Sequence, residues 1–125
     1  MVVGVGTDLM EIARIQQSID RYGEQFVRRI FTFAEIEYCQ RKKNAAESFA
    51  ARFAAKEAAA KALGTGISHG VSWLEIEVAR EPSGRPVLVL SGRAQERARQ
   101  LGVARISLSL THSRETALAV VIMES

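Results

Sequence analysis

An alanine-rich stretch in the middle of the chain limits the possible folds more than any other feature. From residue 44 to 63 nearly every residue is a strong helix former, and the stretch opens with the capping pattern Asn44-x-x-Glu47. Gly64 follows where a helix C-terminal cap belongs. The many alanines, together with Phe53, indicate that much of this helix is buried.

Two charged residues on this helix need an explanation. Glu57 and Lys61 lie one turn apart, on the side that also carries Phe53. The simplest interpretation is an exposed ion pair, which would contribute only ~0.3–0.5 kcal/mol. A carboxylate on a largely buried helix, however, needs a partner, and a cation or metal ion would serve. We therefore take Glu57 as a candidate metal ligand and Lys61 as a candidate phosphate contact.

The remaining patterns predict short strands and helices around this helix. A valine-rich strand at 2–6 precedes a helix that starts with Asp8 as its N-cap and breaks near Gly23. Further helices are predicted at 26–30 and 32–43, the latter opened by the capping box Thr32-x-x-Glu35. Beyond the alanine-rich helix we expect strands at 73–79 and 87–90, a helix at 93–101, and strands at 105–111 and 117–123. Paired strands predict the α+β class, an antiparallel sheet with helices packed on it.

Bulk properties narrow the class of protein. The chain has 125 residues, 47% of them hydrophobic, which fits one domain spanning 1–125. No apolar run approaches the ~20 residues of a membrane span, and the N-terminus does not have the pattern of a signal peptide. The single Cys39 excludes an intrachain disulfide, and of the possible compartments we expect the cytoplasm. Because no apolar run is long enough to span a membrane, we expect no membrane partner.

Positive charge is concentrated in one part of the chain. The net charge is only +3, but residues 41–61 alone carry six basic and two acidic side chains. Such a field favours an anionic partner, which is a phosphorylated ligand, an acidic protein or nucleic acid, although a solubilising surface has the same composition. The stretch lacks the clustered aromatic residues that would stack on bases, so we expect no nucleic-acid partner.

Two further residues could act in catalysis or binding, but each also has a simple structural explanation. Asp8 follows a strand, where a carboxylate can be presented to a ligand or can merely cap a helix. His112 follows an apolar strand at the start of a turn, and a lone histidine there is more often structural than catalytic. Neither residue carries a function by itself.

Taken together, three segments resemble one family. The matching residues are Gly6-x-Asp8-x-x-x-Ile12-x-Arg14-Ile15, then Phe53-Ala54-x-Lys56-Glu57-Ala58-x-x-Lys61-Ala62-x-Gly64-Thr65-Gly66, then Ser109-x-Thr111-His112. This pattern resembles the holo-acyl-carrier-protein synthases, the small bacterial 4′-phosphopantetheinyl transferases. The resemblance covers essentially the whole chain, and the middle segment is the most specific.

The resemblance implies a reaction and a set of residue roles. The serine hydroxyl of an apo acyl carrier protein would attack the β-phosphorus of coenzyme A, giving holo carrier protein and adenosine 3′,5′-bisphosphate, a step in support of fatty acid biosynthesis. Asp8 and Glu57 would hold Mg²⁺, which typically takes one or two carboxylates plus phosphate oxygens and waters. Lys61 would contact phosphate, His112 would contact phosphate or assist proton transfer, and Glu57 is the preferred base.

The resemblance also implies contacts to both substrates and an assembly. Coenzyme A would meet the backbone of Gly64, Thr65 and Gly66. No short motif marks the contacts of its adenosine end, for which Arg52 and the Gly84-Arg85-Pro86 turn are candidates. An acidic carrier protein would dock on Arg14, Arg21 and Arg28, whose seven-residue spacing aligns only if Gly23 does not interrupt the helix. The family also implies a homotrimer with sites at subunit interfaces. A non-catalytic relative is disfavoured because Asp8, Glu57 and Lys61 are intact.

Overall fold

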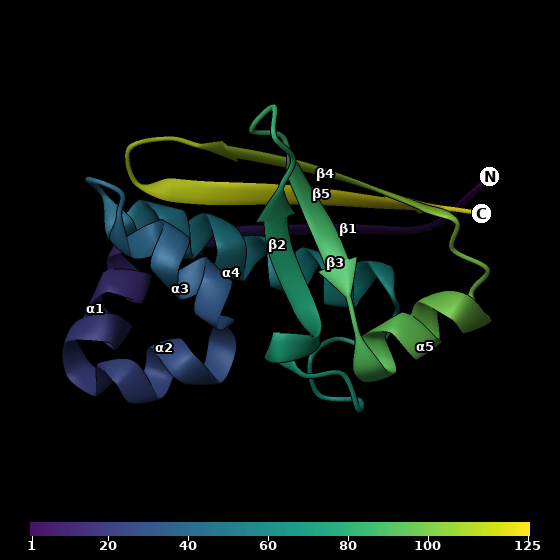
Figure 1. The fold of residues 1–125 in the computed structure, drawn as a ribbon, viewed down its shortest axis with the longest axis horizontal. Helices are drawn as coiled ribbons and strands as arrows, with labels where there is room; N and C mark the ends of the chain where they lie inside the picture. The colour runs from purple at the N-terminus through teal and green to yellow at the C-terminus, as the bar shows by residue number, and fades with distance from the viewer.

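The alanine-rich helix lies at the centre of the molecule. The structure, a computed structural model, describes residues 1–125. In chain order the elements are β1 (Val2–Glu11), α1 (Ile12–Tyr22), α2 (Glu24–Ile30), α3 (Phe33–Gln40), α4 (Ala45–Ala62), the short 3-10 helix η1 (Trp73–Glu75), β2 (Ile76–Arg80), β3 (Pro86–Leu90), α5 (Gly92–Gln100), β4 (Arg105–His112) and β5 (Thr116–Glu124). Figure 1 shows α4 beneath the long strands, with α1 to α3 to one side and α5 at the other end. The predicted α+β class is confirmed.

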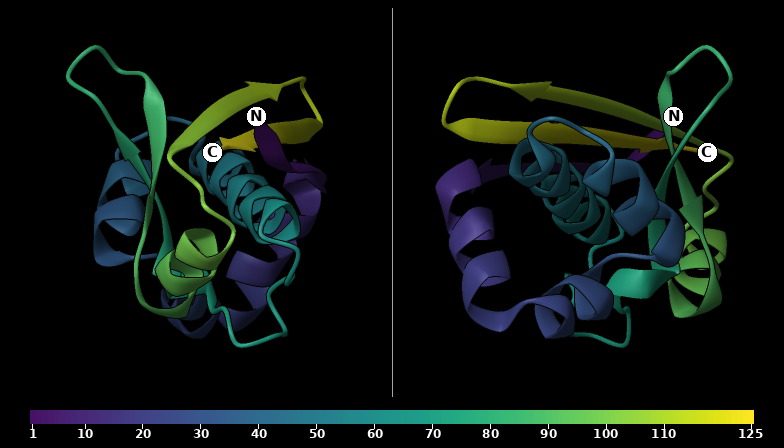
Figure 2. Two further views of the ribbon diagram at one scale, coloured as in Figure 1. Left: turned by 90° about the vertical axis from the view of Figure 1, so that its right-hand side faces the viewer. Right: turned by 60° about the vertical axis from the view of Figure 1, so that its left-hand side comes forward.

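The strands form two antiparallel sheets. A three-stranded sheet has the order β1-β5-β4, and a two-stranded sheet pairs β2 with β3. In the larger sheet Asp8 lies opposite Ala119, which in turn lies opposite Leu110. The β2–β3 hairpin turns through residues 81–85, and its tip stands away from the larger sheet (Figure 2).

Two glycines let β1 lie directly against α4. A Cβ atom at Gly6 would collide with the backbone carbonyl of Ala58, and one at Gly4 would collide with that of Ala62. Side chains of a strand alternate between its faces, so Asp8 lies on the same face as Gly4 and Gly6. The glycines therefore bring Asp8 up to the last turns of α4.

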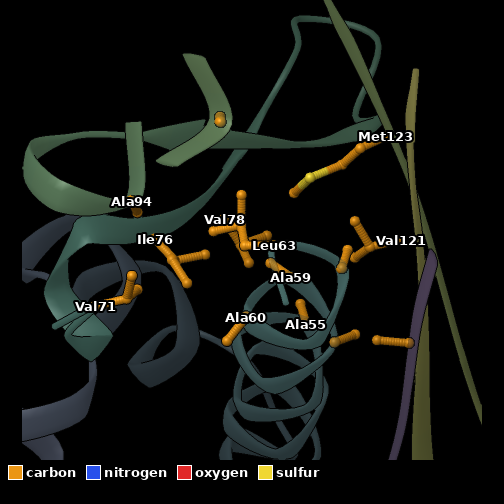
Figure 3. Packing of buried hydrophobic residues seen from close by; sticks show 14 of the residues in the cluster. Ala55, Ala59, Ala60, Leu63, Val71, Ile76, Val78, Ala94, Val121 and Met123 are labelled. Carbon is orange, nitrogen blue, oxygen red and sulfur yellow. The ribbon is translucent and has the colours of Figure 1, made fainter. Parts of the chain in front are cut away.

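Small side chains fill the main core. Ala54, Ala55, Ala58 and Ala59 of α4 have no exposed surface. Figure 3 shows several of the alanines of α4 facing Val121 and Met123 of β5 and Val78 of β2. Alanine is both the best helix former and small enough to allow this close approach of helix and strand.

Several helix boundaries agree with the sequence patterns. The Asn44 side chain accepts a hydrogen bond from the Glu47 backbone at 3.1 Å, and Gly64 follows α4 with a φ of +78°. The capping box of Thr32 and Glu35 is present at the start of α3. Gly23, with a φ of +58°, separates α1 from α2, which confirms the predicted break. α3 ends at Gln40, before the predicted boundary.

The prediction that Asp8 caps a helix is wrong. β1 continues through Asp8 to Glu11 because this segment pairs residue by residue with β5. α1 begins only at Ile12, and its N-cap residue Glu11 makes no side-chain capping bond. The strand predicted at 73–79 also begins late, because a hydrogen bond between the Glu75 backbone N–H and the Ser72 carbonyl folds Trp73–Glu75 into η1.

The two faces of the larger sheet differ in their surroundings. The inner face packs on α4, whereas no helix covers the outer face in Figure 1 or Figure 2. Val5 and Leu9 on this outer face are 57% and 63% exposed. No helix in the structure combines the length and the apolar character that crossing a membrane requires.

We expect Gly6→Ala to destabilise the protein by about 2 kcal/mol, because the added methyl group must push β1 away from Ala58. Urea unfolding measures this change. Glu96→Ala on the exposed surface of α5 is the control and should change the free energy of unfolding by less than ~1 kcal/mol. Equal stability of the two variants would contradict the close packing.

Candidate functional site

Asp8 and Lys61 form the centre of the candidate site. The Lys61 Nζ atom lies 3.0 Å from Asp8 Oδ1 and donates a second hydrogen bond, also of 3.0 Å, to the carbonyl of Thr7. The Asp8 side chain is 16% exposed and that of Lys61 52%. Lys61 thus pairs across to β1, and the simple interpretation of a Glu57–Lys61 pair along the helix is wrong.

Glu57 lies within electrostatic range of both residues. Partial burial raises the pKa of the Glu57 carboxyl above its ordinary value, the Asp8 carboxylate raises it further, and the Lys61 ammonium acts in the opposite direction. Two carboxylates and one ammonium therefore converge from β1 and α4. A second cation at this point would relieve the repulsion between Asp8 and Glu57.

The donor set is consistent with a magnesium ion shared with a ligand. No group of three or more His, Cys, Asp or Glu side chains is arranged to hold a metal ion in the protein alone. Mg²⁺ nevertheless is commonly bound by one or two carboxylates, with phosphate oxygens and waters completing its octahedron. Asp8 and Glu57 meet that requirement in type and number.

The loop after α4 brings backbone and a free hydroxyl close to Lys61. Gly64 and Gly66 have φ values of +78° and +61°, which glycine adopts without strain. The N–H groups of Thr65 and Gly66 both donate to the Ala60 carbonyl. The Thr65 Oγ1 atom is buried and has no hydrogen-bond partner.

A second, cationic cluster lies on another side of α4. The Tyr38 ring is covered by the Arg52 guanidinium at 4.2 Å, the Lys42 ammonium at 4.7 Å and the Arg80 guanidinium at 4.9 Å. Burial alone would raise the pKa of the Tyr38 phenol, but Lys42, Arg80 and Arg52 lower it below its ordinary value. Arg52 is 3% exposed and its Nε–H has no partner. We call Tyr38, Lys42, Arg52 and Arg80 the cationic cluster.

The predicted Arg85-Pro86 turn lies next to Arg80 of the cationic cluster. Pro86 pairs with Arg80 across the β2–β3 hairpin, and a cavity of about 210 Å³ lies between Tyr38, Arg52, Glu77 and Arg80. Tyr38, Lys42 and Arg80 were not predicted from the sequence as members of a site. The concentration of basic residues from 41 onward was the only signal for Lys42, and Arg80 had none.

Within one chain, the cationic cluster and His112 are separate from Glu57. Arg52 precedes Glu57 by five residues, which places the two side chains about 140° apart around α4. His112 Nε2 lies 3.4 Å from Glu47 Oε1 in the first turn of α4, about 15 Å along the helix from Glu57. The structure therefore unites Asp8, Glu57, Lys61 and the 64–66 loop, and leaves Arg52, Arg85, Pro86 and His112 outside that group.

The three predicted docking arginines lie on two helices. Arg14 and Arg21 are exposed on α1, with Arg21 beside the Tyr22 ring. Arg28 is exposed on α2, beyond the break at Gly23, and its Nη2 atom lies 3.5 Å from Glu24. Their side chains do not form one continuous stripe.

An apolar cavity lies between α2 and the Glu57 side of α4. Its volume is about 680 Å³, and its walls include Phe26 and Arg29 of α2, Phe53 of α4, and Trp73. Phe53 lies one turn before Glu57 on the helix, so the cavity reaches the neighbourhood of the candidate site. Arg29, which sequence analysis did not select, is the arginine that faces this cavity.

Comparison with known proteins identifies the family. Residues 4–121 match the family described as the 4'-phosphopantetheinyl transferase superfamily. The chain belongs to this superfamily. The fold brings together Asp8, Glu57 and Lys61, which come from the first two of the three segments that carried the resemblance, whereas His112 of the third segment lies apart beside Glu47.

Individual members of the superfamily match along their whole length. The chain is 55% identical over 124 residues to the holo-[acyl-carrier-protein] synthase of Koribacter versatilis, covering 99% of both chains. The crystal structure of the Neisseria meningitidis holo-[acyl-carrier-protein] synthase superimposes with a TM-score of 0.91 at 34% identity, covering 100% of both chains. The Bacillus anthracis holo-(acyl-carrier-protein) synthase, solved in complex with CoA (3',5'-ADP), gives a TM-score of 0.83 at 39% identity, with 100% of this chain and 98% of that chain covered.

We expect Asp8→Asn to lower the pKa of Glu57 in the metal-free protein, since it removes the neighbouring negative charge. Lys61→Met should raise the same pKa, because it removes the ammonium that opposes the shift. Carbon-13 NMR of the glutamate carboxyl groups as a function of pH measures both changes. Glu96→Gln on α5 is the control and should leave the pKa of Glu57 unchanged. A shift of this pKa in the same direction in Asp8→Asn and Lys61→Met would contradict the electrostatic arrangement.

Proposed function

We propose that this protein transfers the 4′-phosphopantetheine group of coenzyme A to a serine of apo acyl carrier protein. The products are holo carrier protein and adenosine 3′,5′-bisphosphate, and the reaction supports fatty acid biosynthesis. One observation carries the proposal: Asp8, Glu57 and Lys61 converge in a chain that matches holo-[acyl-carrier-protein] synthases from end to end. The single cysteine, Cys39, is buried with a pKa raised to about 11 by desolvation, so its thiol takes no part.

Asp8 and Glu57 are assigned to metal binding, and Glu57 also to accepting the proton of the serine hydroxyl. Asp8 and Glu57 would hold Mg²⁺, which when bound supplies positive charge to the pyrophosphate oxygens. The serine hydroxyl forms a bond to the β-phosphorus as the bond to the adenosine 3′,5′-bisphosphate oxygen breaks. Glu57 accepts the serine proton, directly or through a water.

The end of α4 is assigned to the pyrophosphate. Lys61 is half exposed and already directed toward Asp8, so a phosphate oxygen at Asp8 would also meet the ammonium. Gly64 and Gly66 have no side chains, so the backbone of the 64–66 loop can lie close to the ligand. These contacts orient the β-phosphorus for in-line attack.

The cationic cluster is assigned to the adenosine end of coenzyme A. Arg52 and Arg80 around Tyr38 suit a dianionic phosphate, and the adjacent Arg85-Pro86 turn supplies further contacts. His112, beside Glu47 at the start of α4, is assigned as a further phosphate contact. This cluster faces away from Glu57 on its own chain, so we assign the two halves of one coenzyme A site to neighbouring subunits. A homotrimer through the uncovered sheet face of Val5 and Leu9 would join them. Light scattering of the purified protein measures the assembly.

The carrier protein is assigned to the surface of α1 and α2. Exposed Arg14, Arg21 and Arg28 offer positive charge to an acidic helix, and Arg29 extends that charge to the apolar cavity beside Phe53. The nucleic-acid alternative has less support, since Lys56, one of the basic residues of 41–61, is fully buried and paired with Glu35. A cytoplasmic location remains a prediction from composition.

We expect Glu57→Ala to lower the rate of transfer by about 100-fold or more, because it removes both a metal ligand and the proton acceptor. Helix stability should be nearly unchanged, since alanine is the better helix former. Mass spectrometry of apo carrier protein incubated with coenzyme A, Mg²⁺ and enzyme measures the added phosphopantetheine.

The surface variant Glu96→Gln is the control for this experiment, because Glu96 pairs only with Arg99 on α5. It should transfer at the wild-type rate. Absence of transfer by the wild-type protein would reject the enzymatic function, whereas near-normal transfer by Glu57→Ala would remove Glu57 alone from the mechanism.

We expect Arg14→Glu to raise the KM for carrier protein by about 10-fold while leaving the KM for coenzyme A nearly constant, because only the acidic partner meets this surface. The effect should shrink as the salt concentration rises. Steady-state kinetics with each substrate varied in turn measures both constants.

Arg99→Glu on α5 makes the same charge change away from the proposed docking surface and serves as the control. Equal increases in the two KM values for Arg14→Glu, or an equal effect of Arg99→Glu, would argue against docking on α1.

A further inference from the structure

A fully buried ion pair joins α3 to α4. The Lys56 Nζ atom lies 2.7 Å from Glu35 Oε1, and both side chains have no exposed surface. Lys56 also donates to the carbonyls of Trp73, at 3.1 Å, and Ile76, at 2.6 Å. The three N–H donors of the ammonium are therefore all used.

Glu35 is bonded as completely as Lys56. Its Oε1 atom accepts a further hydrogen bond from the Thr32 backbone at 2.8 Å, and its Oε2 atom accepts one from the Val78 backbone at 2.7 Å. The pair thus connects the N-terminus of α3, the middle of α4, η1 and β2.

Stability alone is a poor explanation for such a pair. Removing two charges from water costs several kcal/mol per ion, and apolar residues of similar volume often serve a core as well or better. The geometry that the pair imposes is a better explanation. Its bonds to the Trp73 and Ile76 carbonyls determine where the η1 backbone lies relative to α4.

That placement forms one wall of the cavity beside Glu57. The Trp73 ring packs on the Phe53 ring, with centroids 4.8 Å apart. Both rings line the 680 Å³ cavity, and Phe53 lies one turn before Glu57. Lys56 itself is the residue directly before Glu57. Lys56 therefore links the wall of the cavity to the part of α4 that carries the acidic side chain.

We propose that Glu35 and Lys56 are positioning residues, which hold Trp73 against Phe53 and so keep the cavity beside Glu57 in the shape that the transfer reaction needs. Neither side chain lines the cavity. This inference rests on the proposed function for its catalytic consequence, but its structural part is independent. Trp73 is the only tryptophan of the chain, so its fluorescence reports on the wall directly.

The test compares Lys56→Met with the double variant Glu35→Gln/Lys56→Met. The single variant leaves the Glu35 carboxylate buried without a cation, so its Tm should fall the most. The double variant has no buried charge and should recover most of the lost Tm, while the Trp73 carbonyl still lacks its donor. We expect acrylamide quenching of Trp73 to rise at least about 2-fold and kcat/KM to fall at least about 10-fold in the double variant, since a small misplacement of a site wall is costly to the rate.

A matched control removes an ion pair elsewhere. Glu96→Gln/Arg99→Gln on α5 should leave Tm, Trp73 quenching and kcat/KM at wild-type values. Wild-type quenching and kcat/KM in a folded Glu35→Gln/Lys56→Met variant would overturn the proposal and make the pair purely structural. Altered quenching in that variant supports the structural part even if the wild-type protein shows no transfer, which would reject the proposed function alone.

Trp73→Phe covers the case in which the double variant does not fold. It keeps the backbone bonds of Lys56 but shrinks the wall, and we expect kcat/KM to fall at least about 5-fold with Tm nearly unchanged. Wild-type kcat/KM in Trp73→Phe would overturn the proposal, because the wall that the pair holds would then have no effect on transfer.

Discussion

The contact between β1 and α4 through two glycines is the constraint on which the site depends. No side chain separates the strand from the helix at Gly4 and Gly6, so the backbone of β1 lies against the carbonyl groups of Ala58 and Ala62. Asp8 follows on the same face of the strand and reaches the level of Lys61. A larger residue at either glycine would separate the carboxylate from the helix. The acidic pair is thus a consequence of backbone packing before it is a matter of side-chain chemistry.

α4 distributes its polar residues among several directions. Glu57 and Lys61 face β1, Arg52 faces Tyr38, and Lys56 points into the core toward Glu35. Each of these charged groups lies beside another charged or aromatic group, as expected on a helix whose surroundings exclude most water. One helix therefore carries a candidate catalytic face, a candidate anion-binding face and a structural clamp.

Local sequence patterns predicted those parts of the fold that depend on local chemistry. The caps at Thr32 and Asn44, the break at Gly23 and the long helix needed only nearby residues, and all are present. Asp8 was misassigned because a strand end and a helix cap have the same local pattern, and pairing with the distant β5 decides between them. The same applies to the site. Glu57 and Lys61 were selected from their burial and spacing, but the pairing of Lys61 with Asp8, of Lys56 with Glu35, and of Arg52 with Arg80 around Tyr38 arises from contacts far apart in the sequence.

The alanines of α4 have a consequence for how this protein tolerates change. At Ala54, Ala55, Ala58 and Ala59, which have no exposed surface, almost every substitution adds atoms to a filled space. The one smaller residue, glycine, weakens the helix by about 1 kcal/mol at each position. In a core of leucine and valine, a larger residue at one position can be compensated by a smaller residue at its neighbour. Alanine side chains are too small for such compensation. The stretch that looks least informative in composition is therefore one in which most substitutions should destabilise the fold.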